Sequence, residues 1–293
     1  MHTFAITPLG PFQLTTSARF LCGFTPGAGT SCINDDALTL GFLADESYAP
    51  TVVRLRQRGD RIEGESPSKN VHEQVARMLS LDHDATALAA VAKKDRVVAH
   101  LLERTPGFRP VCFPSPYEAA VWGVLAQRIR MSMAAGIKRK LAIETGSAVE
   151  GFGRTFFPSP HPKKLLAVKS FPGISAEKLV RLHGIAYAAL DGKLDADSLR
   201  ALPKNTALEH LQKLRGVGRW TAGHILLRGA GIRDELPGME PRVMAGVAKA
   251  YGLKRPSLAS LVRISDGWRP FRMWVSVLIV MNHWTNPPRT LRS

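Results

Sequence analysis

The stretch Leu211-Gln-Lys-Leu-Arg-Gly-Val-Gly-Arg-Trp-Thr-Ala-Gly223 decides the fold of this chain. Apolar residues at helical spacing precede the central glycines, and a second helix starts near Arg219. Gly216 and Gly218 allow a tight turn between the helices, because glycine adopts backbone conformations that other residues avoid. Val217 between the glycines is expected to anchor the turn in the core. The stretch therefore predicts two helices joined by a short hairpin.

The predicted hairpin has the chemistry of a phosphate-binding turn. Its glycines remove side-chain bulk, so a phosphate can approach the free N–H groups at the positive end of the second helix. Arg215 and Arg219 add positive charge on either side of that point. A Gly-Val-Gly turn alone is weak support, since many turns between helices contain glycine.

Charge is distributed unevenly along the chain. The 293 residues include 40 Lys and Arg against 24 Asp and Glu, a formal net charge of +16. Residues 1–110 carry 12 basic and 12 acidic residues, whereas residues 111–293 carry 28 and 12. A positive field in one region favours a polyanion, because each neutralised phosphate releases counterions. A merely basic protein is the alternative, and the hairpin inside the basic region favours nucleic acid.

Composition argues against several other classes of protein. A hydrophobic content of 45% indicates a folded chain, and the three cysteines (Cys22, Cys32 and Cys112) are too scattered for a disulfide scaffold. The longest apolar run, Trp274–Met281, is far shorter than the roughly 18 to 20 residues that span a bilayer. No export signal and no zinc-type ligand cluster is visible. We therefore expect a cytoplasmic protein without a membrane partner.

The length predicts two domains, at roughly 150 residues each as a first guide. Residues 1–68 are expected to form a small α+β domain, with a helix over 16–24 and strands over 37–43, 51–58 and 61–65. From Val71 the pattern is helical to the end, so residues 69–293 are predicted to form a helical domain. Its hairpin occupies 206–227, and its tail, 286–293, is expected to be frayed.

Helix starts and faces can also be predicted. Ser115-Pro116-Tyr117-Glu118 is typical of a first turn, where the serine accepts a backbone N–H and Glu118 reaches back. A helix from Ser132 to Gly146 is expected to expose Lys138, Arg139 and Lys140. Further helices are predicted over 177–190, 206–214, 219–227, 241–251 and 271–284.

Segments on both sides of the hairpin complete a wider pattern. Asp234-Glu-Leu-Pro-Gly-Met-Glu-Pro-Arg-Val-Met and Trp268-Arg-Pro-Phe-Arg-Met-Trp follow it, and Ala126-Gln127 precedes it. Together they resemble the helix-hairpin-helix DNA glycosylases, most nearly the 3-methyladenine DNA glycosylase II branch. The resemblance spans nearly the full chain. It implies a mainly α fold, a two-lobed helical domain with the site in its cleft, and a small sheet-containing N-terminal domain. It also implies a monomer that binds damaged double-stranded DNA.

The resemblance implies a catalytic role for Glu240. The family has an Asp in this loop, where a carboxylate stabilises the oxocarbenium-like sugar or orients water. Glutamate is one methylene longer, and a shift of about 1 Å can cost about a hundredfold in rate. The alternative is an exposed residue at a helix start, although Asp or Ser would cap better. Asp234 matches a family Asp that is expected to brace the loop.

The same resemblance implies a substrate pocket formed by Phe20, Gln127, Trp220 and His224. Electron-rich rings attract the positive charge of alkylated purines. His224 lies one helical turn beyond Trp220 and replaces a tyrosine common in this branch. Core packing is the alternative for Phe20 and His224. Val280 replaces a pocket tryptophan of the branch, which leaves the substrate range open.

DNA contacts are implied for the hairpin and for the segment after the helix that starts at Ser115, at Arg128, Arg215, Gly216, Gly218, Arg219 and Thr221. Arg128 replaces an apolar wedge, and arginine can fill a base stack or bind phosphate. Backbone carbonyls of Gln212, Leu214 and Val217 are expected to hold Na⁺ or K⁺. No other cofactor is expected: an iron–sulfur cluster needs four cysteines, and none lies beyond Cys112.

The leading hypothesis is a monofunctional glycosylase that excises alkylated purines in base excision repair. Trp220 takes the place of the nucleophilic lysine of bifunctional relatives, and an indole cannot attack a sugar carbon. One alternative is a damaged-DNA-binding protein of the same fold with weak or no catalysis, which Glu240, Arg128 and Val280 favour. Another is a glycosylase for deaminated or oxidised bases.

Overall fold

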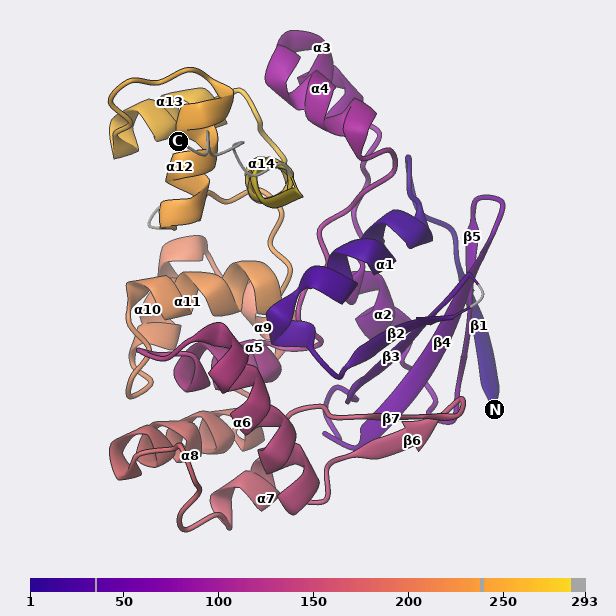
Figure 1. Ribbon diagram of the computed structural model, residues 1–293, viewed down its shortest axis with the longest axis vertical. Helices are drawn as coiled ribbons and strands as arrows, with labels where there is room; N and C mark the ends of the chain where they lie inside the picture. Colours follow the sequence, from indigo (N-terminus) through magenta and orange to yellow (C-terminus); the bar gives the residue numbers. More distant parts are fainter. Residues whose placement is uncertain (35, 238–239, 286–293) are drawn as a thin grey trace, which may run out of the picture.

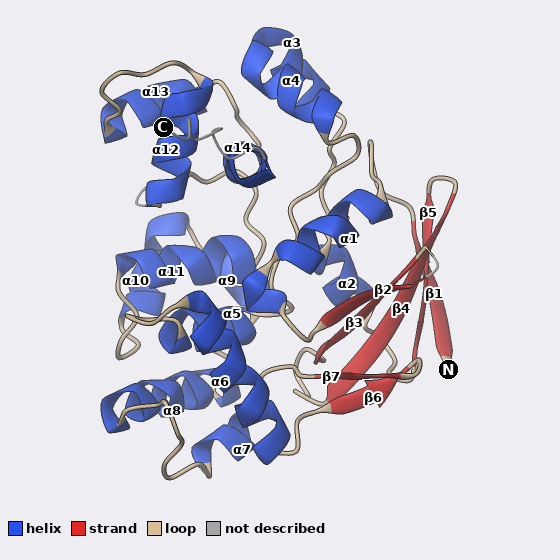
Figure 2. Ribbon diagram, in the orientation of Figure 1, coloured by secondary structure: helices blue, strands red, loops and turns tan. Residues whose placement is uncertain are grey.

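The computed structural model describes residues 1–34, 36–237 and 240–285, so the predicted frayed tail lies outside the described residues. A twisted sheet forms one side of the molecule, and helices form two lobes on the other side (Figure 1). Helix α1 (Leu14–Gly23), close to its predicted range, lies between the sheet and the lobes (Figure 2). The fold is mainly helical with a small N-terminal sheet, as predicted.

The sheet is antiparallel, in the order β1-β5-β4-β3-β2. Its strands are β1 (His2–Ile6), β2 (Ser31–Asn34), β3 (Ala37–Leu43), β4 (Pro50–Arg58) and β5 (Arg61–Ser66). The three inner strands match the predicted ones. The two edge strands were not predicted, because short edge strands with exposed residues carry little apolar patterning.

Segments beyond residue 68 complete the core of the sheet. Helix α2 (His72–Met78) and its flanks contribute Val71, Val75 and Leu79 to the apolar cluster under the sheet. A hairpin of β6 (Val149–Gly151) and β7 (Arg154–Phe156) also lies against it. Gly41 is required there, because a Cβ would overlap the ring of Phe156. The expectation of helices only from Val71 onwards is therefore wrong at this hairpin.

The lower lobe in Figure 1 surrounds α5 (Pro116–Leu125), which is buried along its whole length. The other elements of this lobe are α6 (Met131–Glu144), α7 (Pro162–Leu166), α8 (Ala176–Leu190), α9 (Ala196–Ala201), α10 (Lys204–Gln212) and α11 (Arg219–His224). The chain continues from α11 into a π-helical turn, η2 (Ile225–Gly229). Val217 is 4% exposed in the core of this lobe, so its predicted anchoring role is confirmed.

The upper lobe has a separate apolar core (Figure 1). It contains α12 (Pro241–Ala250), α13 (Leu258–Asp266) and α14 (Arg272–Thr285), together with α3 (Leu88–Lys94) and α4 (Arg96–Arg104) from the early part of the chain. A short 3₁₀ turn, η1 (Thr25–Gly27), follows α1. The segment from Gly229 to α12 therefore connects the two lobes.

Two predicted side-chain positions are wrong. Ser115 caps α5 as predicted, but the buried Glu118 side chain accepts N–H groups from Leu43 at 3.1 Å and Ser159 at 3.0 Å. Lys138 is buried rather than exposed, and its Nζ donates to the carbonyl of Pro26 at 3.3 Å. Burial lowers the pKa of Lys138. The packing of η1 against α6 causes this burial, which helical spacing alone could not show.

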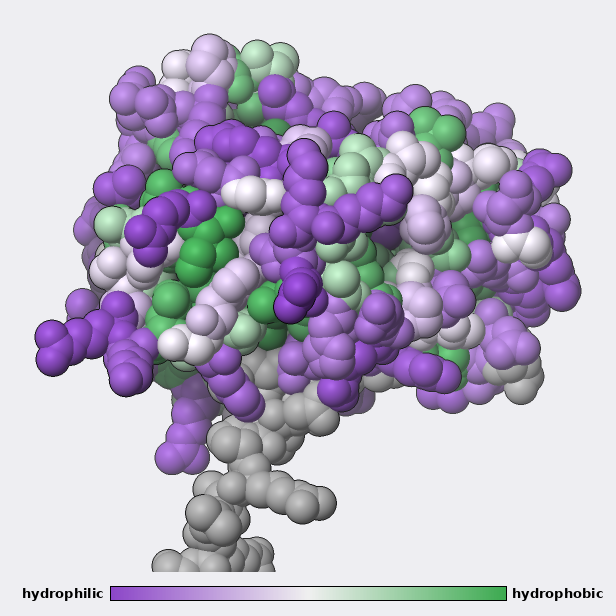
Figure 3. All heavy atoms as spheres, turned by 90° about the horizontal axis from the view of Figure 1, so that it is seen from above, coloured by the Kyte–Doolittle hydropathy of each residue, from purple (hydrophilic) through white to green (hydrophobic). Residues whose placement is uncertain are grey.

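Hydrophilic residues dominate the upper face of the molecule, and apolar residues occupy smaller patches between them (Figure 3). Among the described residues, none of the helices has both the length and the apolar character needed to cross a membrane.

Candidate active site

A cavity of about 1200 Å³ lies where α1, the hairpin and the two lobes meet. Its walls include Phe20 from α1, Gln127 from the turn after α5, and Trp220 and His224 from α11. Glu240, at the start of α12, completes this set. The fold thus brings together residues from four separate parts of the chain that the sequence singled out as one pocket.

Aromatic rings at this cavity form a chain of contacts from α11 to α1, in which the buried Phe113 links the lining rings from behind. The rings of Trp220 and His224 are stacked, with centroids 5.2 Å apart and planes 7° from parallel. His224 meets Phe113 edge-on at 5.1 Å, Phe113 meets Phe24 at 5.7 Å, and Phe24 stacks on Phe20 at 5.4 Å. The sequence reasoning missed Phe24, which lines the cavity and follows Phe20 at helical spacing. Trp220 is 43% exposed, so part of its indole is open to a ligand.

His224 supports Trp220 as an uncharged ring. Burial, with a further contribution from the Arg228 charge, lowers the pKa of His224 to about 3. Its Nε2 is enclosed without a hydrogen-bond partner among the described residues. The ring therefore stays neutral at physiological pH and lies beneath Trp220 without adding positive charge.

Glu240 is held against Trp220 by hydrogen bonds. One carboxylate oxygen, Oε2, accepts the Trp220 Nε1–H at 3.2 Å. The other, Oε1, accepts from Nε of Arg242 at 2.6 Å and from its backbone N–H at 3.3 Å. The side chain is only 15% exposed, so Glu240 caps α12 from inside the cavity rather than from an exposed position.

Two opposing effects act on the ionisation of Glu240. Burial raises the pKa of the carboxyl group, but the hydrogen bonds and charge of Arg242 and the hydrogen bond from Trp220 outweigh burial. The pKa therefore lies below its ordinary value of 4.5. The site presents a fixed carboxylate beside an aromatic wall.

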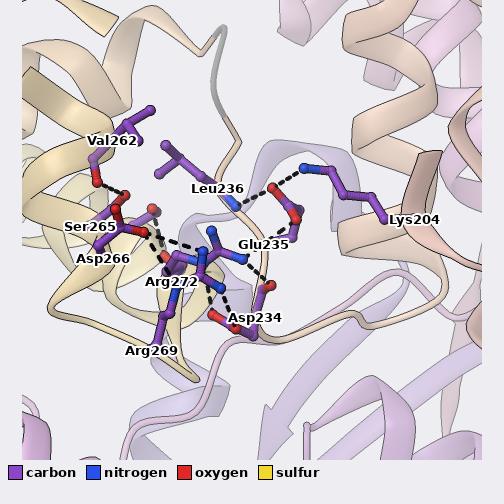
Figure 4. Close-up of polar contacts among 10 residues, drawn as sticks. Lys204, Asp234, Glu235, Leu236, Val262, Ser265, Asp266, Arg269 and Arg272 are labelled. Carbon is purple, nitrogen blue, oxygen red and sulfur yellow. Dashed lines mark hydrogen bonds and ion pairs between the residues drawn. The ribbon is translucent and has the colours of Figure 1, made fainter. Parts of the chain in front are cut away.

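Asp234, at the start of the loop that carries Glu240, is held by ion pairs (Figure 4). Its carboxylate accepts from Arg272 Nε at 2.8 Å and from Arg269 Nη1 at 3.3 Å. Glu235, which the sequence reasoning did not single out, binds Lys204 Nζ at 2.6 Å and lies 3.6 Å from Arg272 Nη2. The loop is thereby fastened to α10 of one lobe and α14 of the other.

The two hairpin glycines differ in their surroundings. Gly216 has φ of +83°, and a Cβ there would overlap the side chain of Arg181. Gly218 leaves open space at the start of α11, where a phosphate has room to approach. Arg219 borders the cavity, and Arg215 is 63% exposed while pairing with Glu177 at 2.8 Å.

The side chain of Thr221 faces inward: it is 5% exposed and packs against Gly123 of α5. A contact of this residue with DNA would therefore come from its backbone N–H in the first turn of α11. The residue faces inward because α11 packs closely on α5, and a threonine methyl fits where Gly123 has no side chain.

The turn after α5 presents Arg128 to solvent with φ of +58°. The adjacent Gln127 lines the cavity, but its amide is bonded elsewhere: Nε2 donates to the Gly216 carbonyl and Oε1 accepts from Arg181 Nη1, both at 2.9 Å. Val280 borders the cavity from α14.

The three carbonyl groups expected to bind a cation lie at the end of α10 and in the hairpin. Carbonyl groups of Gln212, Leu214 and Val217 are hard ligands of the kind that Na⁺ and K⁺ accept, and the Leu214 carbonyl also accepts the Val217 N–H at 3.0 Å. A carbonyl oxygen has a second lone pair, so this bond is compatible with a cation. Among the described residues, no group of three or more His, Cys, Asp or Glu side chains could hold a metal.

The chain is similar in sequence to known repair proteins. It is 25% identical over 217 residues to a DNA-3-methyladenine glycosylase of Bacillus subtilis, covering 71% of this chain and 69% of that protein. It is 30% identical over 186 residues to DNA-3-methyladenine glycosylase 2 of Escherichia coli, covering 56% and 63%. No family model matches the chain.

Solved structures share the fold. A 3-methyladenine DNA glycosylase from Archaeoglobus fulgidus superposes with a TM-score of 0.76 at 18% identity, over 98% of this chain and all of that one. A 3-methyladenine DNA glycosylase of Schizosaccharomyces pombe, solved in complex with abasic DNA, superposes with a TM-score of 0.54 at 21% identity. That match covers 68% of this chain and 96% of the other.

Proposed function

We propose that this chain is a member of the helix-hairpin-helix DNA glycosylase superfamily and a monofunctional glycosylase for alkylated purines in DNA, since it is similar in sequence to DNA-3-methyladenine glycosylases and shares their fold. The observation that carries the proposal is the contact between Glu240 and Trp220 inside the aromatic cavity. A fixed anion and an exposed ring lie side by side where a base and its sugar would enter.

Hydrolysis follows from these two groups. The damaged nucleotide must leave the base stack before its glycosidic bond can be reached. A cationic base then stacks on the open part of Trp220, and the neutral His224 beneath does not repel it. As the bond between base and sugar breaks, Glu240 stabilises the positive charge on the sugar and orients the attacking water. The products are a free base and an unbroken strand with an abasic site.

The hairpin and Arg128 supply the grip on DNA in this proposal. The open N-terminus of α11 at Gly218 and the charge of Arg219 and Arg215 bind backbone phosphate. The carbonyls of Gln212, Leu214 and Val217 would hold a Na⁺ or K⁺ ion, which would add positive charge beside the phosphate. Arg128 occupies the gap left by the base or binds a phosphate beside it. The protein acts as a monomer on chromosomal DNA in the cytoplasm.

Single-turnover base release tests the proposal directly. Duplexes carrying 7-methylguanine, hypoxanthine or 8-oxoguanine are incubated with excess protein, and free base and strand cleavage are measured separately. Release of 7-methylguanine, with strand breaks only after alkali treatment, supports the proposal. Tight binding of all lesions without release identifies a damaged-DNA-binding protein, and release of only the other two bases identifies a different substrate class.

Variants of Trp220 distinguish its stacking on the damaged base from its hydrogen bond to Glu240. We expect Trp220→Ala to slow release of 7-methylguanine by about 30-fold, since a desolvated cation–π contact contributes about 2 kcal/mol. Trp220→Phe keeps a ring but loses the hydrogen bond to Glu240, so its rate is expected to lie between those of the wild type and the alanine variant. Single-turnover rates measure both effects, and an alanine variant as fast as wild type contradicts the stacking role.

The salt dependence of DNA binding tests the proposed contact between the hairpin and backbone phosphate. Removing one phosphate contact by Arg219→Gln is expected to reduce the slope of log K against log salt concentration by about 1. Arg61→Gln, on β5 of the sheet, is the matched control and leaves the slope unchanged. Titration of undamaged duplex at several salt concentrations measures the slope, and equal slopes for Arg219→Gln and wild type would exclude the contact.

A further inference from the structure

We propose that Gln127 is a positioning residue that locks the turn carrying Arg128 to the DNA-binding hairpin. The grip on the backbone and the insertion of Arg128 beside the extrahelical base then act as one rigid unit. This inference rests on the proposed function, because it concerns how a damaged nucleotide is held outside the duplex.

The Gln127 side chain connects three segments of the lower lobe. Its Nε2 donates to the carbonyl of Gly216 in the hairpin at 2.9 Å. Its Oε1 accepts from Arg181 Nη1 of α8, also at 2.9 Å. The amide therefore has a partner at each end, and both partners lie outside the turn that contains Gln127.

Lys178 of α8 fixes the backbone of the same turn. Its Nζ donates to the carbonyls of Leu125 and Gln127, each at 3.0 Å. The Leu125 carbonyl lies at the C-terminus of α5, where helix geometry leaves it without an intrahelical partner and where positive charge is favourable, and the Gln127 carbonyl follows in the turn. The peptide group that leads into Arg128 is thus held from α8.

Arg128 itself has an unusual backbone conformation. Its φ of +58° lies in the left-handed region, which costs free energy for a residue with a side chain and persists only where the surroundings enforce it. The contacts of Gln127 and Lys178 provide that enforcement. The result is an exposed arginine in a turn whose preceding residue is anchored to the hairpin and to α8.

The hairpin side of the connection is equally close-packed. Arg181 lies so near Gly216 that no Cβ would fit there, and Glu177 pairs with both Arg181 at 3.0 Å and Arg215 at 2.8 Å. Helix α8 thereby serves as a common frame for the hairpin and the turn. A movement of the hairpin on a phosphate is transmitted to Arg128 through Gln127.

A double-mutant cycle tests the inference. Gln127→Met keeps the length of the side chain and removes both hydrogen bonds, and Arg128→Ala removes the inserted group. The duplex carries 2-aminopurine opposite an abasic-site analogue that the protein cannot cleave. The fluorescence of 2-aminopurine then reports base unstacking in the absence of any glycosidic bond cleavage. Each single variant is expected to reduce the unstacking equilibrium by about tenfold, a typical effect of losing charge-assisted hydrogen bonds.

The double variant decides between the two roles. If Gln127 acts through Arg128, the double variant is no worse than Arg128→Ala, because the two residues form one unit. The melting temperature of Gln127→Met is measured beside the fluorescence, so that a loss of folding is distinguished from a loss of positioning. Unstacking at the wild-type level in either single variant, or effects that multiply in the double variant, overturns the inference. If the proposed function is wrong, the wild-type protein releases no base in the single-turnover assay. The fluorescence assay does not depend on base release, so the two failures are distinguishable.

Discussion

Replacing Glu240 by Gln is expected to slow single-turnover base release by about 10²- to 10³-fold, with affinity for DNA close to that of wild type. Glutamine has the same shape and keeps a carbonyl oxygen for the Trp220 Nε1–H. It removes the negative charge that stabilises the sugar as the base departs. The loss therefore affects the rate of bond cleavage rather than binding.

Glu240→Asp is the matched control for charge. It keeps the carboxylate but shortens the side chain, so the anion is drawn away from Trp220 and the rate falls, since a displacement of about 1 Å can cost about a hundredfold. Base release from Glu240→Gln at the wild-type rate would show that this carboxylate takes no part in the reaction.

The pH dependence of base release follows from the same carboxylate. The reaction needs Glu240 ionised, and its pKa is lowered below 4.5 because its hydrogen bonds to Arg242 and Trp220 outweigh burial. His224, the other titratable group facing it, is already neutral above a pH of about 3. Rates for a cationic lesion are therefore expected to stay level from pH 7 down to the ordinary carboxyl range and to fall only below it.

Replacing Glu118 by Ala is expected to lower the free energy of unfolding by about 3 to 5 kcal/mol. The change leaves the buried N–H groups of Leu43 and Ser159 without their acceptor. It also removes the negative charge that stabilises protonated Lys138 in the interior. Because these partners lie in the sheet, the β7–α7 connection and α6, the loss weakens the junction between the sheet and the lower lobe.

Urea denaturation followed by circular dichroism measures this effect. Glu144→Ala, an exposed change on α6, is the control and is expected to stay within about 0.5 kcal/mol of wild type. Adding Lys138→Met to Glu118→Ala should recover part of the loss, since the uncompensated charge is then gone. A Glu118→Ala protein as stable as wild type would show that the junction does not depend on this residue.

Local sequence patterns predicted the structure correctly wherever residues that are neighbours in sequence are also neighbours in space. The Ser115 cap, the inner strands and the hairpin with its buried Val217 follow from spacing, turn residues and capping chemistry. The uneven charge is likewise a property of the chain itself. These features predicted the fold class, and the resemblance predicted the set of residues that share the cavity.

Local patterns failed where a distant segment determines the surroundings of a side chain. Lys138 is buried because η1 packs on α6, and Thr221 is buried because α11 packs on α5. Glu118 reaches two backbone groups brought from elsewhere in the chain instead of its own helix start. Helical spacing shows which residues share a face, but it does not show what covers that face.

The amino-acid sequence by itself determined the helices, the hairpin between them, the excess of positive charge and the kinds of side chain available for the site. Only the tertiary structure decided that Glu240 meets Trp220, that His224 is neutral beneath it, and that the Gln127 amide bonds to the hairpin. The physical reason is that hydrogen-bond geometry and burial depend on the packing of segments far apart in the chain, to within fractions of an ångström.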